Sequence, residues 1–195
     1  MSTVASAALF AFVASITPGP NNVMLWASGM NFGLRRTIPH IAGVNVGFSS
    51  LLIATSVGLG ALMQTVPVLS IGLRMFGSAY LVYFAYRIAT AAGTEASTHA
   101  RPFTFLQAAI FQYVNPKAWI MGVTAVGSFL PSDQDLVAGT LLLTALFAVV
   151  NLPCITTWAV AGTALGRVFA DDRKRRYVNV ALAILLLFTI YLINV

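Results

Sequence analysis

Residues 1–34, MSTVASAALFAFVASITPGPNNVMLWASGMNFGL, contain no charged side chain. An apolar stretch of this length is enough to cross a bilayer, which takes about 20 residues of helix. The middle of the stretch, residues 15–22 (SITPGPNN), holds two prolines, a glycine and two asparagines. A proline inside a helix removes a backbone donor and clashes with the preceding turn. The stretch therefore predicts a membrane-spanning helix, at about residues 4–29, that is broken near its middle.

The rest of the chain is equally poor in charge. Of the 195 residues, 58% are hydrophobic and 8% are charged, whereas a soluble domain is about 25% charged. This composition excludes a soluble globular enzyme, and the single cysteine excludes a disulfide-stapled secreted domain. The sequence predicts an all-α polytopic membrane protein with six transmembrane helices. The other five are expected at about 38–62, 68–90, 103–130, 136–165 and 177–194.

The basic residues indicate how these helices are oriented. Nine of the 11 Lys and Arg residues lie in or beside the first, third and fifth connections. These nine are Arg35, Arg36, Arg87, Arg101, Arg167, Arg173, Lys174, Arg175 and Arg176. Short loops that are rich in Lys and Arg stay in the cytoplasm, so both termini are expected on the outside. The cluster at residues 173–176 could also bind anionic lipid, but the alternation favours a topogenic role, and no nucleic-acid partner is expected.

A polar connection at about residues 92–102 divides the chain into halves of three helices each. Repeat one is expected at about 1–91 and repeat two at about 103–195, within one transmembrane transporter domain. Because three is odd, the second half must enter the membrane in the opposite orientation, as in an inverted repeat. The first helix of the second half is also broken, at Asn115-Pro116-Lys117.

Both breaks carry the chemistry of a helix start. Thr17 before Pro18, like Asn115 before Pro116, resembles a capping side chain followed by proline at the first helical position. We expect half-helix amide ends near the middle of the membrane, where their partial positive charge would attract an anion such as a carboxylate. Alternatively, each proline only kinks its helix.

Lys117 is the unusual residue of the predicted membrane region. A lysine at the bilayer centre costs about 2.5–3.5 kcal/mol on insertion scales, and no acidic residue lies in any predicted span. Lys117 therefore faces a wet cavity, or is neutral, or pairs with a substrate carboxylate, and it could carry a proton in a transport cycle. The alternative is a lysine that snorkels to the surface from a shifted helix.

Amide side chains near the breaks complete the candidate site. They can bind the ammonium or carboxylate of a substrate, or satisfy the broken backbone. Asn151, in the middle of the fifth span, either contributes to the same site or joins helices. The expected substrate-binding residues are Thr17, Pro18, Gly19, Pro20, Asn21, Asn22, Asn115, Pro116, Lys117 and Asn151. We expect no metal ligands, no cofactor and no catalytic residues, because the spans lack acids and Cys154 has no partner cysteine.

Residues 17–22 (TPGPNN) resemble the hallmark motif of the LysE/RhtB family of bacterial amino-acid exporters, and Asn115-Pro116-Lys117 resembles its second motif. Gly33, Gly43 and Gly47 are also similar to that family. Residues 122–125 (GVTA) and the chain length are similar to the cysteine/O-acetylserine exporter branch. The resemblance implies a multi-pass protein of the bacterial inner membrane that exports small amino acids by using the proton-motive force.

We therefore expect a secondary transporter for small amino acids or derivatives of the threonine, homoserine, cysteine or leucine type. Its partners would be a small zwitterionic or carboxylate substrate and the lipid bilayer. The sequence is also compatible with a homo-oligomer. Three alternatives remain: an exporter of another small carboxylate-bearing metabolite, a monovalent-cation transporter and a non-transporting membrane scaffold. An intramembrane enzyme is not expected, because no acid or zinc-binding motif lies in the spans.

Overall fold

The computed structural model describes residues 3–91, 101–130, 136–168 and 171–194, and these ranges form helices without any strand. The first half contains α1 (Thr3–Ile16), α2 (Pro20–Phe32), α3 (Leu34–Ala54), the π-helical η1 (Thr55–Leu59), α4 (Gly60–Thr65) and α5 (Pro67–Ala89). The second half contains α6 (Phe105–Val114), α7 (Pro116–Phe129), α8 (Leu136–Val168) and α9 (Asp172–Asn194). The all-helical prediction is confirmed for the described residues. Most of the expected polar connection at 92–102 lies outside them.

Three helical segments within the described ranges are long and apolar enough to cross a membrane: Leu34–Leu62, Pro67–Ala89 and Leu136–Val168. The pair α1 and α2 makes a fourth if it counts as one span, bent by 55° at the break. The predicted spans at 103–130 and 177–194 are not among these segments. The first is divided into the short helices α6 and α7, and the second corresponds to most of α9.

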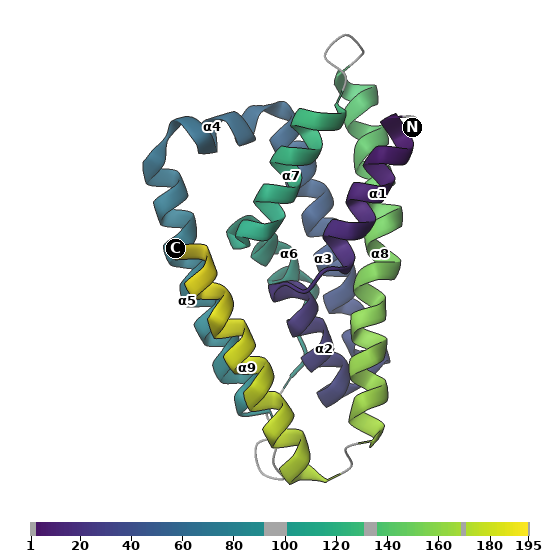
Figure 1. The fold of residues 1–195 in the computed structure, drawn as a ribbon, viewed down its shortest axis with the longest axis vertical. Helices are drawn as coiled ribbons and strands as arrows, with labels where there is room; N and C mark the ends of the chain where they lie inside the picture. Colours follow the sequence, from purple (N-terminus) through teal and green to yellow (C-terminus); the bar gives the residue numbers. More distant parts are fainter. Residues whose placement is uncertain (1–2, 92–100, 131–135, 169–170, 195) are drawn as a thin grey trace.

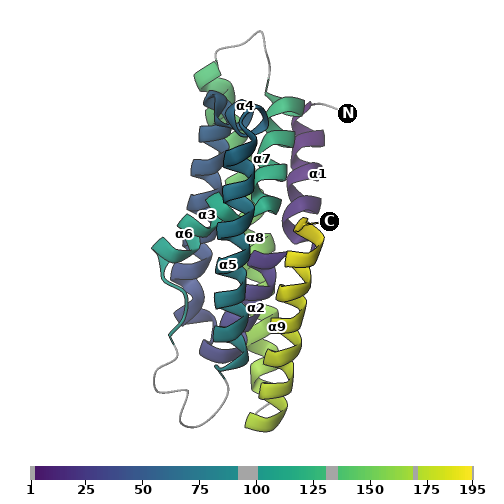
Figure 2. The same ribbon diagram turned by 90° about the vertical axis from the view of Figure 1, so that its left-hand side faces the viewer.

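The two broken helices run in opposite directions along the molecule. In Figure 1, α1 lies above α2, whereas α7 lies above α6, and Figure 2 shows the same order from the side. The chain therefore descends through the first broken pair and rises through the second. The α5 and α9 helices pack against each other and slant away from α1 and α7 toward the top of Figure 1.

Glycines allow α2 and α8 to pack with their backbones in contact. A Cβ atom on Gly162 would collide with the backbone oxygen of Trp26, and one on Gly29 would collide with that of Ala159. The α3 and α6 helices meet in the same way, at Gly43 and Gly47. Small residues that permit such close approach are typical of helix pairs in membranes, and these contacts hold α2 and α6 next to the breaks.

Two connections differ from the expected spans. The η1 segment that follows α3 contains a kink at Gly58, whose φ is 105°, and α4 then lies across the top of the molecule in Figure 1. The basic cluster at residues 173–176 was expected in a connection, but it lies in the first turns of α9. The reason is local. The side chain of Asp171 accepts a hydrogen bond from the backbone N–H of Arg173 and so caps the start of α9, which places the cluster inside the helix.

Candidate functional site

The first break occupies Thr17 to Gly19, and its geometry corrects the expected helix start. Thr17 does not cap the second half-helix, because its hydroxyl donates back to the carbonyl of Ala14 at the end of α1. The residue before α2 is Gly19, in an extended conformation with φ −172°, and Pro20 takes the first helical position. A residue that precedes a proline avoids the helical region, so the two prolines in succession move the restart from Pro18 to Pro20.

The N-terminal end of α2 has no side-chain cap. The backbone N–H groups of its first turn are therefore available for another partner, and the helix dipole places partial positive charge there. An anion is the natural partner for such an end. The expected amide end at the first break is thus present, and it begins at Pro20.

The second break follows the predicted pattern closely. Asn115 is extended and precedes α7, and its side-chain oxygen accepts a hydrogen bond of 3.2 Å from the backbone N–H of Lys117. Pro116 takes the first helical position. Because Asn115 caps this end, α7 offers an anion less free backbone than α2 does. The two breaks are therefore not equivalent.

The ammonium group of Lys117 binds the first break. Its Nζ donates to the carbonyl oxygen of Thr17 at 2.8 Å, to the hydroxyl of Thr17 at 3.0 Å and to the carbonyl oxygen of Pro18 at 3.3 Å. An ammonium has three protons to donate, and these acceptors match that number. The C-terminal end of α1 carries partial negative charge, which the lysine neutralises. Lys117 thus points across to the other broken helix and does not extend along its own helix to the surface.

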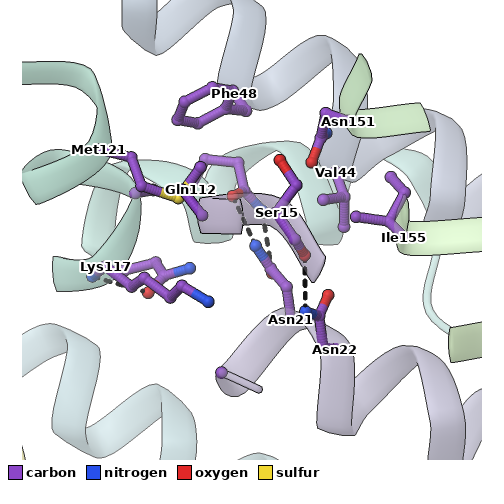
Figure 3. Close-up of a pocket in the computed structure, with 14 residues that line it drawn as sticks. Ser15, Asn21, Asn22, Val44, Phe48, Gln112, Lys117, Met121, Asn151 and Ile155 are labelled. Atoms are coloured by element: carbon purple, nitrogen blue, oxygen red, sulfur yellow. Dashed lines mark hydrogen bonds between the residues drawn. The ribbon is translucent and has the colours of Figure 1, made fainter. Parts of the chain in front are cut away.

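Amide side chains tie the same break to α6. Asn22 donates to the carbonyl oxygens of Ser15 at 2.9 Å and Thr17 at 2.8 Å, so it satisfies backbone that the break leaves free. Asn21 and Gln112 exchange two hydrogen bonds, at 2.8 Å and 3.1 Å. Figure 3 shows these side chains around one cavity, with Lys117 approaching from the other side.

Asn151 lines the same cavity but also joins two helices. Its side-chain N–H₂ donates to the oxygen of Asn45 at 2.9 Å, which links α8 to α3. The structure therefore brings together all the amides that the sequence singled out. The prolines Pro18 and Pro20 and Pro116 shape the breaks and line a neighbouring cleft.

Ser15 and Gln112 are not among the binding residues that the sequence predicts. Ser15 is 4% exposed, and its hydroxyl has no hydrogen-bond partner among the described residues. It lies in the lining of the cavity, and Figure 3 places it between Gln112 and Asn22. A buried hydroxyl without a partner is costly, so this one is available to a ligand. A serine two residues before a break gives no signal in the sequence that separates it from other helix serines.

The cavity is small, at about 30 Å³, and is lined by residues that include Ser15, Asn21, Gln112 and Lys117. This is room for about one water molecule. On the other side of Lys117 lies an open cleft of about 770 Å³. Lys117, Gly19 and Asn115 line both spaces. The lysine side chain therefore forms part of the wall between them.

No group of three His, Cys, Asp or Glu side chains that could hold a metal ion occurs in the described part of the chain. The polar groups around the cavity are hydroxyls, amides, backbone carbonyls and one ammonium. This set suits a small zwitterion, which presents an anion and a cation a short distance apart.

Comparisons with known proteins show the family of this chain. The family model of the LysE type translocators matches residues 12–194. The cysteine/O-acetylserine efflux proteins of Escherichia coli (strain K12) and Shigella sonnei (strain Ss046) are 31% identical over 183 residues, which cover 92% of this chain and 91% of each relative. No solved structure gives a significant match. Since the family match runs from the first helix to the last, the chain belongs to the LysE family of translocators and is a membrane transporter, not an enzyme.

Proposed function

We propose that this protein exports small zwitterionic amino acids or their derivatives from the cytoplasm across the bacterial inner membrane, and that the proton-motive force drives the export. Relatives that are 31% identical carry the name cysteine/O-acetylserine efflux protein, so these two compounds are the first substrates to test. The observation that carries the proposal is the ammonium of Lys117 bound to the carbonyls of the broken first helix.

A zwitterion fits this break because the two half-helix ends differ in charge. The carboxylate would bind the uncapped N-terminal end of α2 and draw Lys117 toward itself. The carbonyls of Thr17 and Pro18 would then lose their present donor. The ammonium of the substrate would replace Lys117 at these carbonyls, so that both oxygens keep a charged donor.

Movement of Lys117 would also provide the necessary space. The cavity of about 30 Å³ is too small for an amino acid, but Lys117 lies between it and the larger cleft. If the lysine swings aside, the two spaces join, and the hydroxyl of Ser15 gains access to a ligand. The amide pair of Asn21 and Gln112 would then form the far wall of the site.

We further propose six transmembrane spans, arranged as two inverted three-helix repeats with both termini outside. The opposite course of the two broken helices in Figure 1 supports this arrangement. The position of the basic residues supports the orientation, since short basic connections stay in the cytoplasm.

The charge at the break bears on two of the alternatives. A monovalent cation would need the carbonyls of Thr17 and Pro18, but the ammonium of Lys117 binds them in this structure. A carboxylate-bearing metabolite without an amine could bind the α2 end, yet it would leave those carbonyls without a donor once Lys117 moves. A scaffold would not need a lysine at this position. The zwitterion therefore accounts for more of the site than these alternatives.

The proposal is tested with inverted membrane vesicles, in which export appears as uptake of a labelled compound. Labelled L-cysteine, O-acetyl-L-serine, L-threonine and L-leucine are supplied with and without a proton gradient. We expect uptake of at least one of them that depends on expression of the protein and on the gradient. Uptake that is equal with and without the protein for every small amino acid would refute the exporter. Uptake that depends on the protein but not on the gradient would refute the proton coupling alone.

A further inference from the structure

A second cation, Arg74, lies in the wall of the large cleft. It lies on α5, which contributes Leu73 and Arg74 to the lining, and Lys117 contributes to the same lining from α7. The side chain of Arg74 is exposed, and among the described residues it has no hydrogen-bond or ion-pair partner. An arginine without a counter-ion inside an apolar helix is costly, so its guanidinium is available to an anion.

Arg74 lies inside an apolar candidate span, near the end at which α5 begins. The α5 helix is one of the apolar candidate spans and begins at Pro67. Arg74 follows Pro67 by 74 − 67 = 7 residues, which is about 10 Å along a helix. In Figure 1 the beginning of α5 lies at the same end of the molecule as the N-terminus. By the charge distribution, this is the end away from the cytoplasm.

No acidic side chain lines the cleft within the described residues. The other cleft-lining groups with polar side chains are Asn115, Thr124 and Thr189, which are neutral, and most of the remaining wall is apolar. The positive charges of Lys117 and Arg74 therefore set the sign of the potential inside the cleft. A positive potential attracts a small oxyanion.

We propose that Arg74 forms a second, outer binding station for the carboxylate of the exported compound. This inference rests on the proposed function, and it adds a site that the two broken helices do not contain. The planar guanidinium can hold a carboxylate through two parallel hydrogen bonds. A compound that leaves Lys117 then meets a second cation before it reaches water. Transport through several sites of moderate strength is faster than release from one deep site, because each step is smaller.

The phosphodiester of an anionic lipid headgroup, such as that of phosphatidylglycerol, also carries one negative charge and presents two oxygens to a guanidinium. Arginine near a helix end can reach such a headgroup by extending its side chain. The shared chemistry is an oxyanion bound by Arg74, and the assay must distinguish an exported carboxylate from the headgroup of an anionic lipid.

The test uses the full-length protein in vesicles of phosphatidylcholine alone and in vesicles that also contain phosphatidylglycerol. We expect Arg74→Gln to lower the rate of labelled L-cysteine export about tenfold in both lipids, the size expected for the loss of one charge-assisted contact. Equilibrium binding of L-cysteine to the purified variant should stay near that of the wild type, because Lys117 and the two breaks are unchanged.

Two matched variants keep the test decisive. Arg74→Lys keeps the charge and should export faster than Arg74→Gln. Met75→Gln is the control, because Met75 is an exposed neighbour on α5 that does not line the cleft, and this variant should export at the wild-type rate. An Arg74→Gln rate equal to the wild-type rate would overturn the station, as would a defect seen only with phosphatidylglycerol or an Arg74→Lys rate no higher than that of Arg74→Gln. Failure of the wild-type protein to export would instead refute the proposed function.

Discussion

Replacement of Gly19 by alanine should disable export without unfolding the protein. A Cβ atom built at Gly19 would lie 2.7 Å from Cδ and 3.1 Å from Nζ of Lys117. The φ of −172° at this position is extended backbone that alanine adopts freely. The collision is therefore with the lysine side chain and not with the helix ends.

The size of the effect follows from how far the lysine must move. Carbon atoms pack at about 3.5–4.0 Å, so Cδ must shift by about 1 Å. The longest bond of the ammonium, to the carbonyl of Pro18, is already 3.3 Å, and a shift of this size takes it beyond hydrogen-bonding distance. A hydrogen bond to a charged group contributes about 1.5–3 kcal/mol, which corresponds to a change of about tenfold or more in an equilibrium constant. The methyl group also fills space through which the lysine must swing.

The assay is uptake of labelled L-cysteine into inverted vesicles, scaled to the amount of protein in the membrane. We expect Gly19→Ala to accumulate normally and to transport about tenfold more slowly than the wild type. Gly127→Ala is the matched control, because a Cβ atom there meets nothing within 4 Å. Transport by Gly19→Ala at the wild-type rate would refute the reasoning, and so would an equal loss in both variants.

Three further predictions concern the surroundings of the site. Asn21→Ala should lower the free energy of unfolding in detergent by about 1–3 kcal/mol, because it leaves the side-chain oxygen of Gln112 unpaired. The double variant with Gln112→Leu should recover most of this loss, and no recovery would show that the pair is not the cause. Ser15→Ala should leave the thermal unfolding midpoint unchanged, because the hydroxyl has no partner in the described structure. It should raise the substrate concentration at half-maximal export by about fivefold. An unchanged half-maximal concentration would exclude a contact between Ser15 and the substrate. Gly162→Ala should cost about 1–3 kcal/mol, because its methyl group would press on the backbone of Trp26, and an unchanged unfolding midpoint would contradict the close packing of α2 and α8.

The positions of the two breaks could be predicted from the sequence, because proline acts on the helix that contains it. Asn115 and Pro116 begin α7 as expected. At the first break the same rule failed by two residues, since Pro18 and Pro20 both qualify for the first helical position. Only the conformation of Gly19 decides between them, and it depends on how the chain turns between α1 and α2.

The contacts of the site could not be predicted, because they join distant parts of the chain. Lys117 binds residues that are about 100 positions away, and Gln112 binds Asn21 across 91 positions. The sequence shows that Lys117 has no acidic partner nearby, but it gives no sign that backbone carbonyls take that place. The length criterion for spans also fails for α6 and α7, because a broken helix leaves two pieces that are each too short.

The most direct test of the central claim is export by Lys117→Met, which keeps the length of the side chain and removes its charge. Export of labelled L-cysteine is measured in inverted vesicles, together with the amount of the variant in the membrane. We predict that the variant accumulates as the wild type does and that its export falls to the background of vesicles without the protein. Export at the wild-type rate by an equally abundant Lys117→Met protein would contradict the claim that this lysine and the broken first helix form the transport site.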